Sequence, residues 1–512
     1  MSDNTSSNKR IAKNTLFLYV RMFLIMVVSL YATRVVLQAL GEQDYGIYNV
    51  VGGIVVMFSF LSRVLASASQ RYFAFELGRD NKERLKQVFS ITLILYALVI
   101  VIIILATELF GMWFLYNKAT IPPERMVAAT WILQFSIISF SITLLTTPYQ
   151  ADIIAHEKMD VYAYIGFLEA GLQLALALIL KYVYFTSDIL IIYGLLVLIA
   201  SIITHGSYIV YAYKKYDESH FQRFWDSKLA KELLSYSGWN IFGALAGVAR
   251  SQGINMLINA FFNPVINAAR GVAYQINNAI NQFASNFYTA VRPQVTKNYA
   301  KGDLSATMSL VFSSSKLTYY LLLFIAVPIM VFAAPILDIW LDIVPEHTLL
   351  FTELVIIVAL IDSLSNPLMT LAQATGKVKL YQVVVGSLLL LNLPVSYVFL
   401  LLGYPAEVTM VVAIVISAIS LMARLFILRR ITTFSIKQYF SQVLLAILIP
   451  TIFSFGVVLL LNIVLWPSCS SIGIILLKFS MATIITVGII LLTGLNKKEK
   501  NMIVEIVRNR LK

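Results

Sequence analysis

The stretch PYQADIIAHEKMDVYAYIG, residues 148–166, has a counterpart 219 positions later in PLMTLAQATGKVKLYQVVV, residues 367–385. The two stretches share four residue types at the same spacing: Pro148 and Pro367, Ala155 and Ala374, Lys158 and Lys377, and Tyr162 and Tyr381. A weaker pair agrees, since GRDNKERLKQVFS from Gly78 resembles KGDLSATMSLVFS from Lys301 at a separation of 223. Two alignments with nearly the same offset predict duplication of a unit within the chain.

The composition indicates that the duplicated unit belongs to a membrane protein. Of the 512 residues, 59% are hydrophobic and only 13% are charged, and the mean hydropathy is +0.81. These values lie far outside those of soluble globular domains. Lipid offers backbone groups no hydrogen-bonding partner, so the apolar stretches are expected to be helices.

Fourteen stretches are long enough to cross a hydrocarbon core of about 30 Å, which takes roughly 20 residues. The first follows a polar segment without a convincing cleavage site, so we expect it to be retained as a membrane helix. The expected spans are 14–38, 46–66, 87–108, 126–148, 159–180, 187–212, 234–262, 268–291, 305–333, 347–371, 380–402, 406–427, 440–464 and 471–494.

The two echoing stretches each follow an outward-to-inward helix, six helices apart. An even number of helices gives both copies the same orientation, so the repeat is parallel. The predicted fold is an all-α integral membrane protein of two six-helix bundles plus two C-terminal helices. The expected parts are an N-terminal lobe (1–213), a cytoplasmic amphipathic linker whose middle is helical (214–233), a C-terminal lobe (234–430), and two further helices with a basic tail (431–512).

The distribution of basic residues predicts the topology. Alternating the fourteen spans places 28 lysines and arginines on the side of both termini and three on the other side. Such a bias indicates that both termini are cytoplasmic. The net charge of +13 is therefore explained by topology rather than by nucleic-acid binding.

Charges inside the first twelve spans are mostly positive: Arg21, Arg34, Arg63, Arg250, Arg270, Lys316 and Arg424, against Glu169, Glu353 and Asp362. A lipid-facing charge costs about 2.5–3.5 kcal/mol, so seven unpaired cations would cost on the order of 20 kcal/mol. Most must therefore face protein or water. Two similar lobes suggest a cleft between them that opens alternately to either side.

Six of these cations are candidates for a cationic substrate-binding cavity: Arg21, Arg34, Arg63, Arg250, Arg270 and Lys316. Arg250 lies halfway along its span, and the alternative for it is an ion pair with Glu169 or Asp362. Arg21 and Arg34 are thirteen residues apart, about 140° around a helix, so only one can face the cleft. Arg21 is favoured, and Arg34 can reach the outer interface. Anchoring at an interface is the alternative for Arg63, Arg270 and Arg424.

Glu169 and Asp362 could carry a coupling proton or cation, or they could neutralise the arginines. His205 is expected to be a packing residue. The single cysteine, Cys469, excludes an intramolecular disulfide and a multi-cysteine metal site. No catalytic motif stands where it could function, the outer loops are short, and we expect no enzyme activity, no cofactor and no metal.

A cleft rich in arginine favours an anionic substrate, because guanidinium groups match phosphate and carboxylate oxygens with paired hydrogen bonds. Four segments carry a resemblance to a known family: LGEQDYGIYNVVGG, LASASQRYFAFELGRDN, TPYQADIIAHEKMDVYAYIG and ELLSYSGWNIFGALAGVARSQGINMLI. With these the chain resembles, over essentially its whole length, the Wzx-type polysaccharide flippases. Their superfamily also holds the MATE multidrug exporters and the lipid II flippases.

The resemblance implies a MATE-like fold in the bacterial cytoplasmic membrane. It also implies transfer of an undecaprenyl-pyrophosphate-linked oligosaccharide to the outer leaflet for O-antigen, capsule or exopolysaccharide synthesis. Cavity arginines of similar flippases support roles for Arg21, Arg250 and Arg270, a proton or sodium ion is the expected driving ion, and polymerase machinery is an expected partner. The alternative is a cation-coupled multidrug exporter. Similar exporters often carry an acidic residue in the first helix, where this chain has Arg21 and Arg34.

Overall fold

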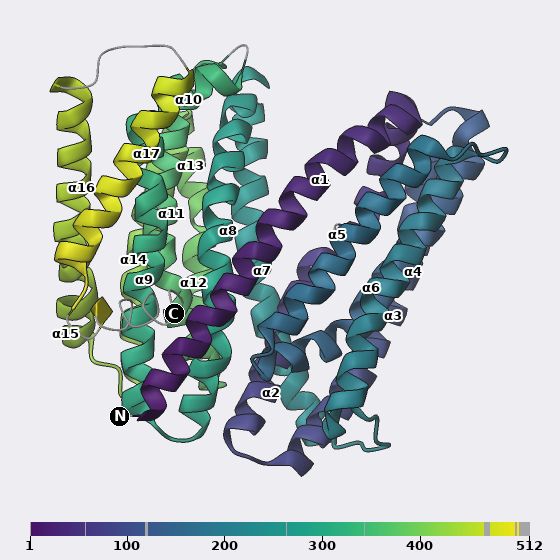
Figure 1. The fold of residues 1–512 in the computed structure, drawn as a ribbon, viewed down its shortest axis with the longest axis horizontal. Helices are drawn as coiled ribbons and strands as arrows, with labels where there is room; N and C mark the ends of the chain where they lie inside the picture. Colours follow the sequence, from purple (N-terminus) through teal and green to yellow (C-terminus); the bar gives the residue numbers. More distant parts are fainter. Residues whose placement is uncertain are drawn as a thin grey trace, which may run out of the picture. The chain divides into compact units, whose positions relative to one another are not determined.

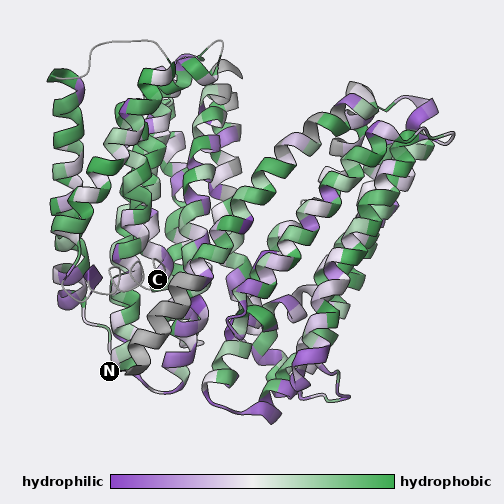
Figure 2. Ribbon diagram, viewed as in Figure 1, coloured by the Kyte–Doolittle hydropathy of each residue, from purple (hydrophilic) through white to green (hydrophobic). Residues whose placement is uncertain are grey.

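The computed structural model describes residues 2–56, 58–117, 121–262, 264–341, 344–464, 472–496 and 499–500. Cys469 and nearly all of the predicted basic tail lie outside these residues. The described chain is helical and contains no strand (Figure 1). Apolar residues cover the long middles of most helices, and hydrophilic residues gather at many helix ends and in connecting loops (Figure 2). The prediction of an all-helical membrane protein is therefore confirmed.

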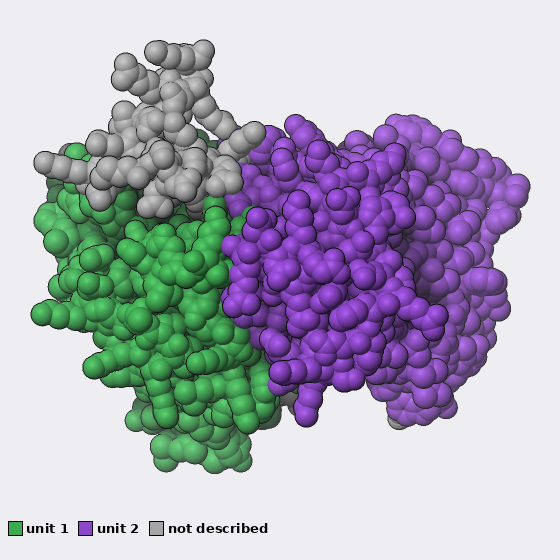
Figure 3. Space-filling view, turned by 90° about the horizontal axis from the view of Figure 1, so that it is seen from below, with its two compact units in different colours: residues 1–12, 239–512 green, residues 13–238 purple. Residues whose placement is uncertain are grey.

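The chain forms two compact units (Figure 3). The N-terminal unit comprises residues 13–238, and the C-terminal unit comprises residues 1–12 and 239–512. The predicted lobe boundaries remain predictions. Each unit is described separately below.

The N-terminal unit is built on α4. Helix α4 packs against α6, α2 and α3, and α5 packs against α6. The second half of α1 joins two apolar cores, one with α5 and one with α3 and α4. The helices are α1 (Ser2–Val56, which begins in the C-terminal unit), α2 (Ser59–Gly78), α3 (Lys82–Asn117), α4 (Met126–Ala155), α5 (Met159–Tyr182) and α6 (Ile189–Lys215), with 3-10 turns η1 (Pro123–Arg125) and η2 (Asp217–Ser219).

The C-terminal unit is built on α11, which packs against α8, α9 and α14. The two helices beyond the predicted repeat, α16 and α17, both pack against α9. The elements are α7 (Ser227–Phe261, which begins in the N-terminal unit), α8 (Pro264–Ala300), α9 (Leu304–Val331), α10 (Ala333–Trp340), α11 (Thr348–Ala374), α12 (Val378–Leu390), α13 (Asn392–Leu401), α14 (Val408–Ile431), α15 (Ile436–Tyr439), α16 (Leu445–Val464) and α17 (Ile472–Ile489), with π-helical turns η3 (Phe440–Leu444) and η4 (Ile490–Gly494).

Within the described residues, eleven helices are long and apolar enough to cross a membrane. They fall at eleven of the fourteen predicted spans. The other three spans, 14–38, 234–262 and 268–291, lie in α1, α7 and α8, which contain residues whose side chains are outside the described part of the chain, so these spans stay predictions. Helix α8 is also the least apolar of the three, since asparagines and glutamines recur along it.

The duplicated stretches form the same turn. Glu157, with φ 64°, and Gly376, with φ 75°, are left-handed residues 219 positions apart, each between two helices. The lysines that follow also match, since Lys158 has φ −85° and ψ 62° and Lys377 has φ −87° and ψ 59°. In the weaker echo the left-handed residues are Asp80 and Gly302, 222 positions apart, so the structural offset differs by one residue from the sequence offset of 223.

The linker differs from its prediction. Residues 221–226, expected to be helical, are not; only η2 precedes them, and α7 begins at Ser227. Local hydrogen bonds explain the difference, because the Asp226 carboxylate accepts from the backbone N–H groups of Lys228 and Leu229 and so starts α7 there. The backbone N–H of Gln222 donates to Ser90 Oγ at 3.0 Å.

Candidate functional site

Arg21 lies on α1 and packs against α5 in the N-terminal unit. Its guanidinium lies over the Tyr162 ring at 4.4 Å, and Nη2 donates to Glu169 Oε2 at 3.4 Å. Gly166 makes this approach possible, because a Cβ there would stand 2.1 Å from Arg21 Nε. Burial leaves Nε without a hydrogen-bond partner. The guanidinium therefore keeps donor capacity beyond its one long ion pair.

A cavity of about 300 Å³ lies beside Glu169. The Glu169 side chain is half-exposed, and His205 also lines the cavity. The two ring nitrogens of His205 each lie 3.0 Å from a threonine hydroxyl, those of Thr143 and Thr146. His205 thus links α6 to α4, as its predicted packing role requires, while also facing a polar space.

In the C-terminal unit, Arg250 on α7 lies beside Asp362 on α11. Arg250 Nη1 and Asp362 Oδ2 are 4.0 Å apart, at the outer limit of an ion pair, and Asp362 is 41% exposed. The sequence predicts Glu169 or Asp362 as an alternative partner for Arg250. Within this unit the neighbouring carboxylate is Asp362. The pair is too loose to satisfy the guanidinium, whose side chain is mostly buried.

Arg270, at the start of α8, is 2% exposed. Its donors contact neutral groups: Nη1 bonds to the Asn255 side chain, and Nη2 donates to the Ser251 carbonyl at 3.5 Å. The guanidinium also lies 4.3 Å from the centre of the Tyr274 ring. Among the residues that the structure describes, no carboxylate contacts it, and Nε has no hydrogen-bond partner. Arg250 is close enough to act on it electrostatically.

The remaining predicted cations are placed differently. Lys316 is buried, and its Nζ lies 2.7 Å from Glu499 Oε2, so it is paired with the chain's C-terminal segment. Arg63 is exposed on α2. Arg424 is buried and donates from Nε to the Tyr381 hydroxyl at 2.9 Å. The side chain of Arg34 lies outside the described residues.

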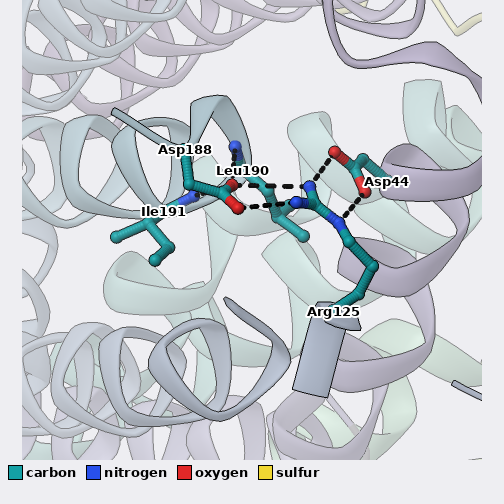
Figure 4. A network of polar contacts seen from close by, with 5 residues as sticks. All are labelled: Asp44, Arg125, Asp188, Leu190 and Ile191. Atoms are coloured by element: carbon teal, nitrogen blue, oxygen red, sulfur yellow. Dashed lines mark hydrogen bonds and ion pairs between the residues drawn. The ribbon is translucent and has the colours of Figure 1, made fainter. Parts of the chain in front are cut away.

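Two polar clusters were missed by the sequence analysis. The first centres on Arg125, in η1 (Figure 4). Its guanidinium holds both oxygens of Asp44 and both of Asp188, with Nε–Oδ1 at 2.8 Å to Asp44 and Nη1–Oδ2 at 2.6 Å to Asp188. Asp188 also caps α6 by accepting from the N–H groups of Leu190 and Ile191. The signal was one of only three cations predicted on the outer side, with acidic residues near neighbouring helix ends.

The second cluster lies at the duplicated turn. His156 Nδ1 is 3.3 Å from Asp152 Oδ1, and Nε2 is 3.1 Å from Glu218 Oε1. Tyr216 stacks on the imidazole at 4.0 Å, and Ser219 donates to Asp152 Oδ2 at 2.8 Å. Burial alone would lower the pKa of His156, but its bonds to the two carboxylates raise that pKa to about 9.

These three side chains could offer ligands to a divalent cation. A protonated histidine already faces both acids, because Nδ1 lies beside the Asp152 carboxylate and Nε2 beside the Glu218 carboxylate. The same contacts hold the pKa of Glu218 below its usual range, although burial opposes this. The cluster therefore fastens η2 to the end of α4.

Comparisons with known proteins agree with this architecture. Residues 253–398, from α7 to α13, match the model of the MatE family. A search of curated proteins gives no match. Among solved structures, a MATE transporter in complex with MaD3S is 13% identical with a TM-score of 0.70, covering 83% of this chain and 97% of that one.

Two further structures are equally similar. The MATE transporter ClbM in complex with Rb+ is 14% identical with a TM-score of 0.70, covering 85% of this chain and 97% of that one. A MOP superfamily transporter from Pyrococcus furiosus, described by a binding pocket of reverse polarity, is 13% identical with a TM-score of 0.69, covering 83% and 96%. At such identities the likeness establishes the fold: this chain is a multi-pass membrane protein with the fold of the MATE transporters.

Proposed function

We propose that this protein is a Wzx-type flippase that moves an undecaprenyl-pyrophosphate-linked oligosaccharide from the cytoplasmic to the outer leaflet by alternating access. The observation that carries the proposal is incompletely neutralised guanidinium groups on membrane helices of both units. In the N-terminal unit this group is Arg21, and in the C-terminal unit these are Arg250 and Arg270.

The energetic argument is strongest for Arg270. A buried guanidinium that meets only neutral oxygens and an aromatic ring keeps its full charge, which in a membrane costs about 2.5–3.5 kcal/mol. Its neighbour Arg250 adds repulsion rather than relief. An anionic ligand would remove this penalty, and a pyrophosphate offers several oxygens to planar, bidentate donors.

The same fold can serve transporters whose binding pockets differ in charge. The transporter from Pyrococcus furiosus is described as having a binding pocket whose reverse polarity suggests a different function. The candidate arginines of this chain fit a change of substrate on the same fold. The charge of the binding cavity, rather than the fold, selects the charge of the transported molecule. The expected setting is the bacterial cytoplasmic membrane, with both termini cytoplasmic and no enzyme activity.

Glu169 and Asp362 suit the energy-coupling step. Each is the partner of a candidate arginine and is about half-exposed. Binding of an anion to the arginine would release the carboxylate, which could then take up a proton or a sodium ion. The return step would re-form the ion pair. Substrate and ion would thereby be coupled through competition for one guanidinium.

The test is mass spectrometry of lipid-linked oligosaccharides in a bacterial strain that lacks this protein, with the leaflet assigned by enzyme accessibility in inverted vesicles. We expect the complete repeat unit to accumulate on the cytoplasmic leaflet. Wild-type protein should reverse this, and Arg250→Glu and Arg270→Gln should not, at equal membrane abundance. Arg429→Gln, which removes an exposed arginine from the last turn of α14, is the matched control. Normal transfer by Arg250→Glu would contradict the proposal.

A second candidate function is cation-coupled multidrug export. It is favoured by the half-exposed Glu169 beside a cavity that also contains His205 and Gln173, an arrangement able to bind a cation. This function predicts cation-driven efflux of dyes from an overexpressing strain, lost in Glu169→Gln. Absence of efflux, together with accumulation of the lipid-linked unit in the deletion strain, would exclude it.

A further inference from the structure

An apolar groove of about 750 Å³ runs between α5 and α6 in the N-terminal unit. It is distinct from the cavity beside Glu169, because the two share no lining residue. The side chains from α5 recur at helical spacing and form one wall, and those from α6 form the other. The lining residues are Val161, Tyr164, Ile165, Leu168, Ile202, Ile203, Gly206, Ser207, Val210, Tyr211, Lys214 and Lys215.

The walls contain large apolar side chains that are exposed. Tyr164 is 58% exposed, Ile202 48% and Val210 54%. Gly206 deepens the groove, since a Cβ at this position would meet no heavy atom within 4 Å. The groove is therefore open beside Gly206, where no neighbouring side chain fills it.

The length of the groove fits one leaflet. From Ile202 to Lys215 the α6 backbone rises about 20 Å, at 1.5 Å per residue. Half of a hydrocarbon core is roughly 15 Å deep, which leaves a few ångströms for a headgroup. A chain that lies in the groove would therefore end near the middle of the bilayer.

Charged side chains line only one end of the groove. Lys214 and Lys215 form the last turn of α6, are exposed, and line the groove at the end predicted to be cytoplasmic. The rest of the lining is apolar apart from three hydroxyl groups, of which Ser207 donates its own to the Ile203 carbonyl. An apolar slot with two cations at the headgroup level is complementary to an amphiphile with an anionic head.

We propose that this groove binds one anionic phospholipid of the cytoplasmic leaflet, with its phosphate on Lys214 and Lys215 and one acyl chain between α5 and α6. The length of the groove favours an acyl chain over a polyprenyl chain, which would extend far beyond it. The lipid fills space between α5 and α6 and so stabilises their contact. This site is independent of the proposed transport substrate.

The experiment uses the full-length protein, purified in detergent and depleted of lipid. Native mass spectrometry measures binding of phosphatidylglycerol and of phosphatidylethanolamine with identical chains. A phosphatidylglycerol with a photoreactive group on one acyl chain then locates the site by peptide mapping. The variants are Lys214→Gln/Lys215→Gln, Gly206→Phe, and the control Lys228→Gln/Lys231→Gln, which removes two exposed lysines of α7.

The lysine double variant should weaken phosphatidylglycerol binding about thirtyfold and leave phosphatidylethanolamine unchanged, since each lysine near a headgroup contributes about a factor of five. Gly206→Phe should abolish labelling of α5 and α6, and the control should match wild type. If Gly206→Phe does not fold, the exposed lysine variant still decides the question. Labelling elsewhere, equal binding by the lysine variant, or displacement of the lipid by a polyprenyl phosphate would overturn the proposal.

Discussion

Replacing His156 with glutamine removes the only cation that contacts both Asp152 and Glu218 among the described residues. The imidazole connects the end of α4 to η2, and its side chain is 21% exposed, so solvent screens it only partly. Glutamine keeps the ability to hydrogen-bond but cannot carry a positive charge. The variant also loses the ring that stacks on Tyr216, so the pH dependence of the stability difference reports the contribution of the charge.

The magnitude follows from the raised pKa. In the folded protein the pKa of His156 is raised from 6.5 to about 9, so the stabilisation is complete below pH 6.5 and is lost as the pH rises through 9. The complete stabilisation by protonated His156 corresponds to about 3 kcal/mol. Most of this stabilisation remains at pH 7, less than half at pH 8, and almost none at pH 10.

The assay is equilibrium unfolding of the detergent-purified protein at several pH values between 6 and 10. The stability difference between wild type and His156→Gln should shrink across this range by the amounts given. His220→Gln, in the linker that also carries Glu218, is the control, because the His220 ring meets a backbone carbonyl rather than a carboxylate. A difference that is independent of pH would refute the reasoning. An NMR titration of the four histidines gives the pKa directly.

Two further predictions concern packing and buried charge. Gly166→Ala would place a Cβ 2.1 Å from Arg21 Nε and should cost about 1–3 kcal/mol in unfolding experiments. Gly171→Ala, on the same helix with no heavy atom within 4 Å, should be neutral or stabilising by about 0.5–1 kcal/mol, so equal losses would contradict the contact. Lys316→Ala leaves Glu499 buried and unpaired and should cost about 3–5 kcal/mol. Adding Glu499→Ala should restore part of this loss, and additive losses would show that the two side chains do not interact.

The sequence was sufficient for the membrane class and for most helices. Lipid solvates only apolar side chains, and a helix satisfies its own backbone, so long apolar runs predict spans without knowledge of packing. The span at 268–291 is less clear from hydropathy, because asparagines and glutamines recur along α8. The duplicated stretch was visible as a pattern, and its turn at Glu157 and Gly376 gives that pattern a common backbone.

Which charges meet was decided by the tertiary structure. Arg21 and Glu169 are 148 positions apart, and no spacing rule joins them; the contact depends on the approach of α1 to α5 that Gly166 allows. Arg125 contacts acids 81 and 63 positions away for the same reason. Hydropathy is a local property that each segment carries by itself. Pairing of side chains depends on helix rotation and register, which are set when the helices pack.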